Sequence, residues 1–125
     1  MFTVSELKQY FVTNMPYTYY ANEFPTQSTT DAAFVRLTGG FPPSQWTPKK
    51  RPSFQVLMRG SETGGPALEA KANSIFGHLH NRAEFVIGTT RIVHCSSDQS
   101  SPLYLGRDEN NRPLYSLNFT CVVME

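Results

Sequence analysis

The residue types most able to bind a metal ion or to act as a nucleophile are three histidines and two cysteines. His78 and His80 lie two residues apart in a predicted helix, where such positions point about 200° apart, so they cannot share a ligand geometry. His94 and Cys95 are neighbours in a predicted strand, so their side chains face opposite sides of the sheet and cannot form a Cys–His dyad. We therefore predict no zinc or cysteine-nucleophile site, and we expect surface histidines and buried, unpaired thiols.

Other catalytic patterns fail on spacing. The Gly39-Gly40 and Gly64-Gly65 pairs lack the lysine and the spacing of a phosphate-binding loop, and no G-x-S-x-G or H-E-x-x-H motif occurs. The acidic pair Asp108-Glu109 lies in a predicted turn beside arginines, which is typical of a solvated ion cluster. The sequence thus predicts no enzymatic activity and no cofactor, with a small enzyme of unknown chemistry as the alternative.

A proline-rich segment, Phe41–Pro52, carries the most informative local pattern. Four prolines in twelve residues exclude a helix or an inner strand, so we expect a stiff arm that projects from the domain. The arm holds the one tryptophan of the chain, Trp46, and a run of cations, Lys49-Lys50-Arg51. It is either a solvated linker or a contact arm, in which Phe41 and Trp46 anchor a macromolecular partner and the cations meet an acidic protein surface or DNA. We favour a protein partner.

Composition limits the class of protein. A chain of 125 residues with 39% hydrophobic residues is long enough for one domain with one core, which we expect over residues 1–125. The net charge of +1 excludes a global electrostatic footprint for nucleic acid or membrane. No apolar run approaches the roughly 20 residues of a membrane span, and the first residues predict no signal peptide. Aromatic residues at 13% suit a sheet-rich protein or a large contact surface.

Two helices are expected. Thr3 and Glu6 form a capping box at the start of the first helix, and Pro16 ends it. The second helix has Pro66 at its first position and an apolar face that runs from Leu68 to Leu79.

The remaining periodic segments predict strands at 32–38, 54–59, 85–87, 90–95, 103–105 and 114–124, with an extended segment at 17–24. In the last strand, Tyr115, Leu117, Phe119, Cys121 and Val123 form one face, and Ser116, Asn118 and Thr120 form the other. The order of elements predicts an α+β fold with a mainly antiparallel sheet packed against two helices.

Three segments carry a family resemblance: Phe54–Gly60, Ala72–Asn81 and, most specifically, Pro102–Phe119. Together they resemble the minor capsid proteins of tailed bacteriophages, and within these the tail-terminator group, which completes the tail and joins it to the head. The resemblance covers residues from about Phe54 to the C-terminus. The arm has no clear counterpart in it.

The resemblance implies a structural virion protein that forms a ring of six subunits on the head-proximal end of the tail tube. Such a ring ends the growth of the tube, offers a docking surface for the head connector, and lets double-stranded DNA pass through its lumen without sequence-specific binding. The implied partners are other copies of the chain, the tail-tube protein and the connector, and no membrane. The alternatives are a head-side neck or stopper protein and a small nucleic-acid-binding module.

Seven residues are the candidates for partner binding: Phe41, Trp46, Lys49, Lys50, Arg51, Arg107 and Asp108. The first five belong to the arm. Arg107 and Asp108 follow Gly106 in the predicted turn before the last strand, where they fix either the turn or a neighbouring subunit.

Overall fold

The computed structural model describes residues 1–25 and 31–124, which contain two helices and eight strands. The elements are α1 (Val4–Asn14), β1 (Tyr19–Ala21), β2 (Ala32–Leu37), β3 (Lys49–Lys50), β4 (Ser53–Arg59), α2 (Gly65–Leu79), β5 (Arg82–Ile87), β6 (Thr90–Ser97), β7 (Leu103–Arg107) and β8 (Pro113–Met124).

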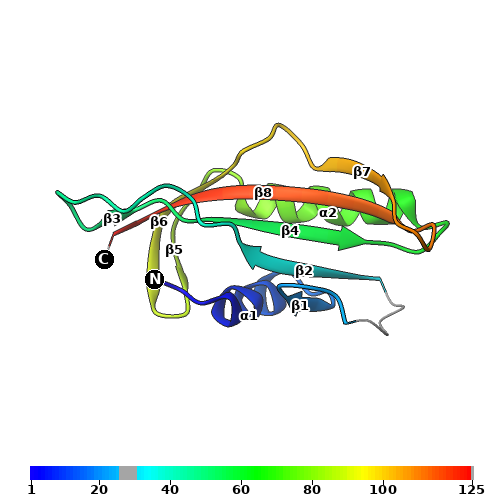
Figure 1. The fold of residues 1–125 in the computed structure, drawn as a ribbon, viewed down its shortest axis with the longest axis horizontal. Coiled ribbons are helices and arrows are strands. Elements are labelled where there is room, and N and C mark those ends of the chain that lie inside the picture. Colours follow the sequence, from blue (N-terminus) through cyan, green and yellow to red (C-terminus); the bar gives the residue numbers. More distant parts are fainter. Residues whose placement is uncertain (26–30, 125) are drawn as a thin grey trace.

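The strands form one sheet with the order β1-β2-β4-β8-β6-β5, while β3 and β7 pair with β8 beside that path (Figure 1). Every pairing is antiparallel except that of β1 with β2. The predicted α+β fold with a mainly antiparallel sheet is confirmed. The parallel pairing of β1 was not predicted, because a single short extended segment carries no signal of its direction.

Helix α1 begins as its capping box predicts. The Thr3 hydroxyl accepts a hydrogen bond from the Glu6 amide at 3.2 Å, and the Glu6 carboxylate accepts one from the Thr3 amide at 2.9 Å. Leu7 and Phe11, on the predicted apolar face, are fully buried.

Helix α2 begins one residue earlier than predicted, at Gly65, so Pro66 is its second residue. A proline is equally acceptable there, because the amides of the first turn have no partner within the helix. His80 ends the helix, and Asn81 follows in the left-handed region with a φ of 57°. Asparagine is one of the few residues other than glycine that adopts this conformation readily.

The centre of the sheet is β8, which pairs with β4 along one side and with β7 and then β6 along the other. Its predicted apolar face is confirmed, because Leu117, Phe119, Cys121 and Val123 are all buried. On the opposite face, the polar side chain of Ser116 is buried, with 2% of its surface exposed. The Ser116 hydroxyl accepts hydrogen bonds from the side-chain amides of Gln55, at 2.8 Å, and Asn118, at 3.1 Å, and these bonds satisfy its burial.

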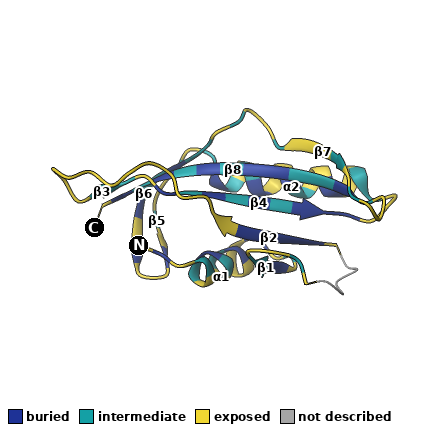
Figure 2. Cartoon of the chain, viewed as in Figure 1, coloured by how far each residue is buried: buried dark blue, intermediate teal, exposed yellow. Residues whose placement is uncertain are grey.

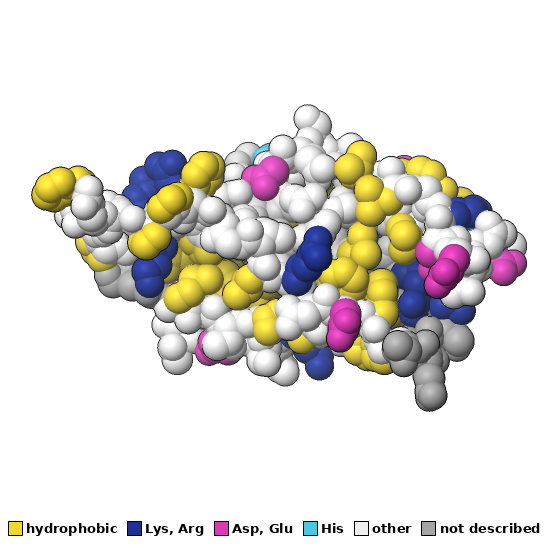
Figure 3. All heavy atoms as spheres, viewed as in Figure 1, with side chains coloured by type: hydrophobic (Ala, Val, Ile, Leu, Met, Phe, Trp, Pro, Cys, Tyr) yellow, Lys and Arg dark blue, Asp and Glu magenta, His cyan; other side chains and the backbone are white. Residues whose placement is uncertain are grey.

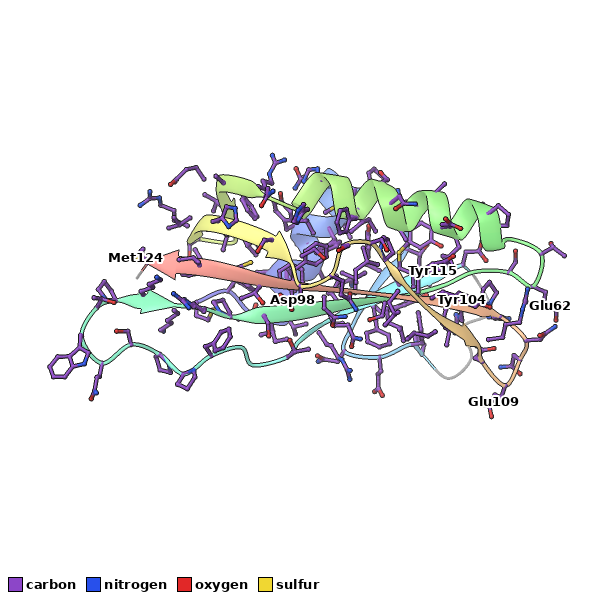
Figure 4. The ribbon with its side chains drawn as sticks, turned by 90° about the horizontal axis from the view of Figure 1, so that it is seen from above. Glu62, Asp98, Tyr104, Glu109, Tyr115 and Met124 are labelled. Atoms are coloured by element: carbon purple, nitrogen blue, oxygen red, sulfur yellow. The ribbon has the colours of Figure 1, made fainter. Side chains whose placement is uncertain are left out.

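Both helices pack on one face of the sheet, and the core lies between them and the strands (Figures 2 and 4). Phe119 of β8 meets Phe54 of β4 with ring centroids 5.4 Å apart, and Phe54 meets Phe11 of α1 at 6.1 Å. Neither described helix covers the other face, which we call the open face.

Candidate interaction surfaces

The proline-rich arm, residues 41–52, is closed at its base by an isolated bridge between Phe41 and Arg51, in which the Phe41 amide donates to the Arg51 carbonyl at 3.0 Å. Gly40 has a φ of 78°, and a Cβ there would lie 2.1 Å from that carbonyl oxygen. Only glycine allows so close a passage of the two chain segments. The arm extends beyond the end of the sheet (Figure 1), as the prolines predict.

The tip of the arm is a folded turn. The Ser44 hydroxyl accepts hydrogen bonds from the amides of Trp46 and Thr47, both at 3.2 Å, and the Ser44 amide donates to the Lys49 carbonyl at 3.3 Å. Serine closes turns of this kind through its side chain. The turn presents the Trp46 side chain to solvent with 86% of its surface exposed.

The end of the arm corrects one prediction. Lys49 and Lys50 form the short strand β3, opposite Met124 and Val123 at the end of β8, although we predicted a loop throughout. Proline excludes pairing only at its own amide, and these two residues lie between Pro48 and Pro52. Through β3 the base of the arm is attached to the central strand.

The cations of the arm lie near its base. Lys49 and Lys50 are half-buried along β3, and Arg51 is exposed. Lys49 and Arg51 line a shallow cavity of about 320 Å³ together with Phe41, Pro42 and Ser44. The Phe41 ring is 62% exposed. The arm therefore combines two exposed aromatic rings with positive charge, as predicted, and its partner stays a prediction.

Arg107 and Asp108, the two candidates outside the arm, lie at the other end of the molecule and hold the turn between β7 and β8. Arg107 Nη1 donates to the carbonyl oxygens of Glu62, at 2.9 Å, and Asn111, at 2.7 Å. Asp108 Oδ1 accepts from the amides of Asn110 and Arg112, both at 2.9 Å. Of the two roles left open by the sequence, these contacts support the fixing of the turn.

Strand β7 presents apolar side chains to solvent. Leu103, Tyr104 and Leu105 are 47%, 51% and 48% exposed, and among the described strands only β8 pairs with this one. The Tyr104 ring packs on Tyr115, with centroids 5.3 Å apart. An exposed edge strand with apolar side chains is a surface on which another chain can pair or pack.

The strand register places an apolar row across the open face. Phe34 of β2 lies opposite Leu57 of β4, Leu57 opposite Ser116 of β8, and Ser116 opposite Leu103 of β7. Cross-strand partners share one face of a sheet, so these four side chains lie side by side. Figure 3 shows hydrophobic side chains across this part of the open face. We call Phe34, Leu57 and Leu103 the apolar row; Leu105, two residues further along β7, lies at the bulge between Tyr104 and Gly106 and is also exposed.

We did not predict the apolar row. Its signal in the sequence was Leu57, an apolar residue that shares one face of its strand with the polar residues Gln55 and Arg59. Leu103 of β7 carried no such signal. Its place in the row depends on the pairing of β7 with β8, which the sequence of β7 does not specify.

The histidines contact different partners. The Tyr10 hydroxyl and His78 Nε2 are hydrogen-bonded at 3.0 Å between α1 and α2, while His80 Nδ1 accepts from the Ser97 amide at 3.1 Å. Burial, with a smaller effect of the Arg82 charge, holds the pKa of His78 below its usual value. Within residues 1–25 and 31–124, no three His, Cys, Asp or Glu side chains gather closely enough to hold a metal ion.

Cys95 and Cys121 are buried, free thiols that lie directly opposite each other on β6 and β8. Their hydrogen bond and their burial raise the pKa of the Cys95 thiol. The sequence predicted a small buried hydrophobe at Cys121, and this is confirmed, but the pairing of the two strands could not be predicted from spacing. We assign both thiols to packing.

Comparison with models of known protein families gives a match. The model of the family described as "Bacteriophage tail terminator protein" matches residues 6–124, which is nearly the whole chain. No curated protein matches the chain. Of the helices described here, α1 and α2, neither has the length and apolar character needed to cross a membrane.

Proposed function

The chain belongs to the bacteriophage tail terminator family, and from this membership we propose that it forms a six-membered ring on the head-proximal end of the tail tube. Proteins of this family are structural components of the virion, and they act at the end of the tail. In our proposal the ring ends tube growth and provides the surface on which the head connector docks. The match over residues 6–124 is the observation that carries the proposal.

The distribution of exposed surface supports a ring. A ring subunit needs two different lateral surfaces, because each copy contacts its two neighbours head to tail. The arm and the β7–β8 end are two such surfaces, and they lie at opposite ends of the long axis (Figure 1). The ring also needs axial surfaces for the tube and for the connector.

Passage of DNA through the lumen is the second part of the proposal. A channel through which DNA slides is poorly served by tight phosphate clamps, and the net charge of +1 is compatible with weak contact. We therefore assign the cations Lys49, Lys50 and Arg51 to a contact with another protein of the neck. In our proposal the protein lies in the neck of the virion, between the head and the tail.

The proposal is tested by the native mass of the purified chain, alone and after mixing with the tail-tube protein of the same phage. Six chains of 14.1 kDa give about 85 kDa. We expect this mass, or a stable complex that contains six copies for each tube end. The tube protein alone serves as the control. A chain that remains monomeric in both samples would contradict the proposal.

A further inference from the structure

We infer that the arm of one subunit docks on the apolar row of the neighbouring subunit, with Trp46 packed against Leu103 and Leu105. This inference names the lateral contact of the proposed ring and therefore rests on that ring. The occupant of the apolar row is a second copy of this chain.

The arm has the features of an anchor that is formed before binding. Its base is closed by the Phe41–Arg51 bridge, and its tip by the hydrogen bonds of Ser44. A preformed loop loses little conformational freedom when it binds, so more of its contact energy appears as affinity. Tryptophan is among the residues that most often dominate the energy of an interface. At 86% exposure, nearly all of the Trp46 side chain is free to be buried by a partner.

The apolar row and Leu105 have the chemistry that such an anchor needs. Leu103 and Leu105 are about half-exposed, and Leu57 is half-buried beside Ser116. At the β2 end of the row, Phe34 is covered by the Phe24 ring, with centroids 5.0 Å apart. The accessible part of the row is thus the part nearest β7. An indole ring placed there would bury aliphatic surface on both partners.

The arm of the same chain cannot be the occupant. Its base is held by the pairing of Lys49 and Lys50 with the end of β8, whereas β7 pairs with the beginning of β8. Figures 1 and 4 show the arm and β7 at opposite ends of the molecule. A contact between two different surfaces at opposite ends is heterologous, which is the kind of contact that closes a ring of identical subunits.

The arm carries the cations Lys49, Lys50 and Arg51, and the β7–β8 end carries side chains of both signs, with Arg112 in the same turn as Glu109. Glu62 and Glu109 project from the β7–β8 end (Figure 4), and both side chains are exposed. Arg107 at the same end is hydrogen-bonded to two backbone carbonyls of its own chain. Lys49 and Arg51 of an incoming arm would lie near these carboxylates once Trp46 is seated. Such rim charges favour the correct register more than they add affinity.

Disulfide trapping tests the inference. A Trp46→Cys chain is mixed with a Leu103→Cys chain under the conditions in which rings form, and the products are separated on a non-reducing gel. We expect a cross-linked dimer from the mixture, and a ladder that extends to six chains from the double variant. The matched control replaces Leu103→Cys with Val12→Cys, since Val12 on α1 is 41% exposed and lies away from the open face. The wild-type chain controls for Cys95 and Cys121, which are buried.

The outcomes separate the two levels of the proposal. If rings form, and neither the Trp46→Cys and Leu103→Cys pair nor a second pair, Trp46→Cys with Leu105→Cys, cross-links above the control, the arm contact is wrong and the ring stands. If the wild-type chain forms no ring with or without the tube protein, the proposed function fails, and the arm contact fails with it. Cross-links from either pair and none from the control support the inference. In a binding measurement between subunits, Trp46→Ala should raise Kd on the order of a hundredfold.

Discussion

Replacement of Trp46 by alanine should separate folding from assembly. In the free subunit the side chain is 86% exposed and touches little of the core, so we expect the free energy of unfolding to change by less than about 0.5 kcal/mol. Assembly should respond very differently. A tryptophan side chain buries on the order of 200 Å², worth about 5 kcal/mol at roughly 25 cal/mol per Å².

Part of this energy is offset when the side chain is immobilised at the interface. If that offset and incomplete burial together remove about 2 kcal/mol, about 3 kcal/mol remains for each contact, which is on the order of a hundredfold in Kd. Because every subunit of a ring makes the same contact twice, once as donor and once as acceptor, the loss accumulates around the ring. Heads and tails in a lysate that carries Trp46→Ala should therefore fail to join.

The assay compares the thermal unfolding midpoint of the purified variant with the yield of joined particles by electron microscopy. Gln45→Ala is the matched control, because Gln45 is an exposed neighbour on the same arm. Normal joining with Trp46→Ala would show that the arm is a linker and not a contact. A large fall in the unfolding midpoint would show that Trp46 belongs to the core, and either result would refute this reasoning.

Three further predictions concern the turn, a buried thiol and the cations. Gly106→Val should lower the free energy of unfolding, measured by urea denaturation, by about 1–3 kcal/mol, because Gly106 has a φ of 91°. Gly106→Asn should cost less, because asparagine adopts this conformation more readily. Equal costs for the two variants would show that the positive φ is not the cause. Cys121→Ala should cost at most about 2 kcal/mol and leave the native mass unchanged, and dissociation of the wild-type protein by a reducing agent would contradict the packing role. Glutamate at Lys49, Lys50 and Arg51 together should weaken assembly at low salt and less at high salt, as measured by native mass; an effect independent of salt would exclude an electrostatic contact.

Local signals predicted the elements that local interactions determine. The capping box of Thr3 and Glu6 fixed the start of α1 to the residue, and the alternation along residues 115–123 identified the buried face of β8. These patterns depend on neighbours within four residues, so a single sequence contains them.

Features that depend on the order of the strands in the sheet could not be predicted from the sequence. Strand β3 forms because β8 extends far enough to pair with Lys49 and Lys50. The sequence around these lysines contains no pattern that predicts this pairing. The pairing of Cys95 with Cys121 and the apolar row require the order of strands in the sheet, which connects residues 13 or more positions apart. For the candidate site, the exposed Trp46 was predictable from its prolines, whereas its proposed counterpart at Leu103 was not.

For the arm, composition predicted its projection from the domain, and the structure shows which residues hold its shape. Four prolines predicted that the segment projects, and the structure adds that its tip is held by Ser44 and its base by Arg51. A stiff, ordered arm is compatible with a contact role, because little entropy is lost on binding.

The most direct test of the central claim is electron microscopy of a lysate from a phage that lacks this gene. The account predicts filled heads and separate tails, with tails that are overlong or irregular at the head-proximal end, and recovery of joined particles when the wild-type chain is supplied. Joined virions with tails of normal length in the absence of the protein would contradict its assignment as the tail terminator.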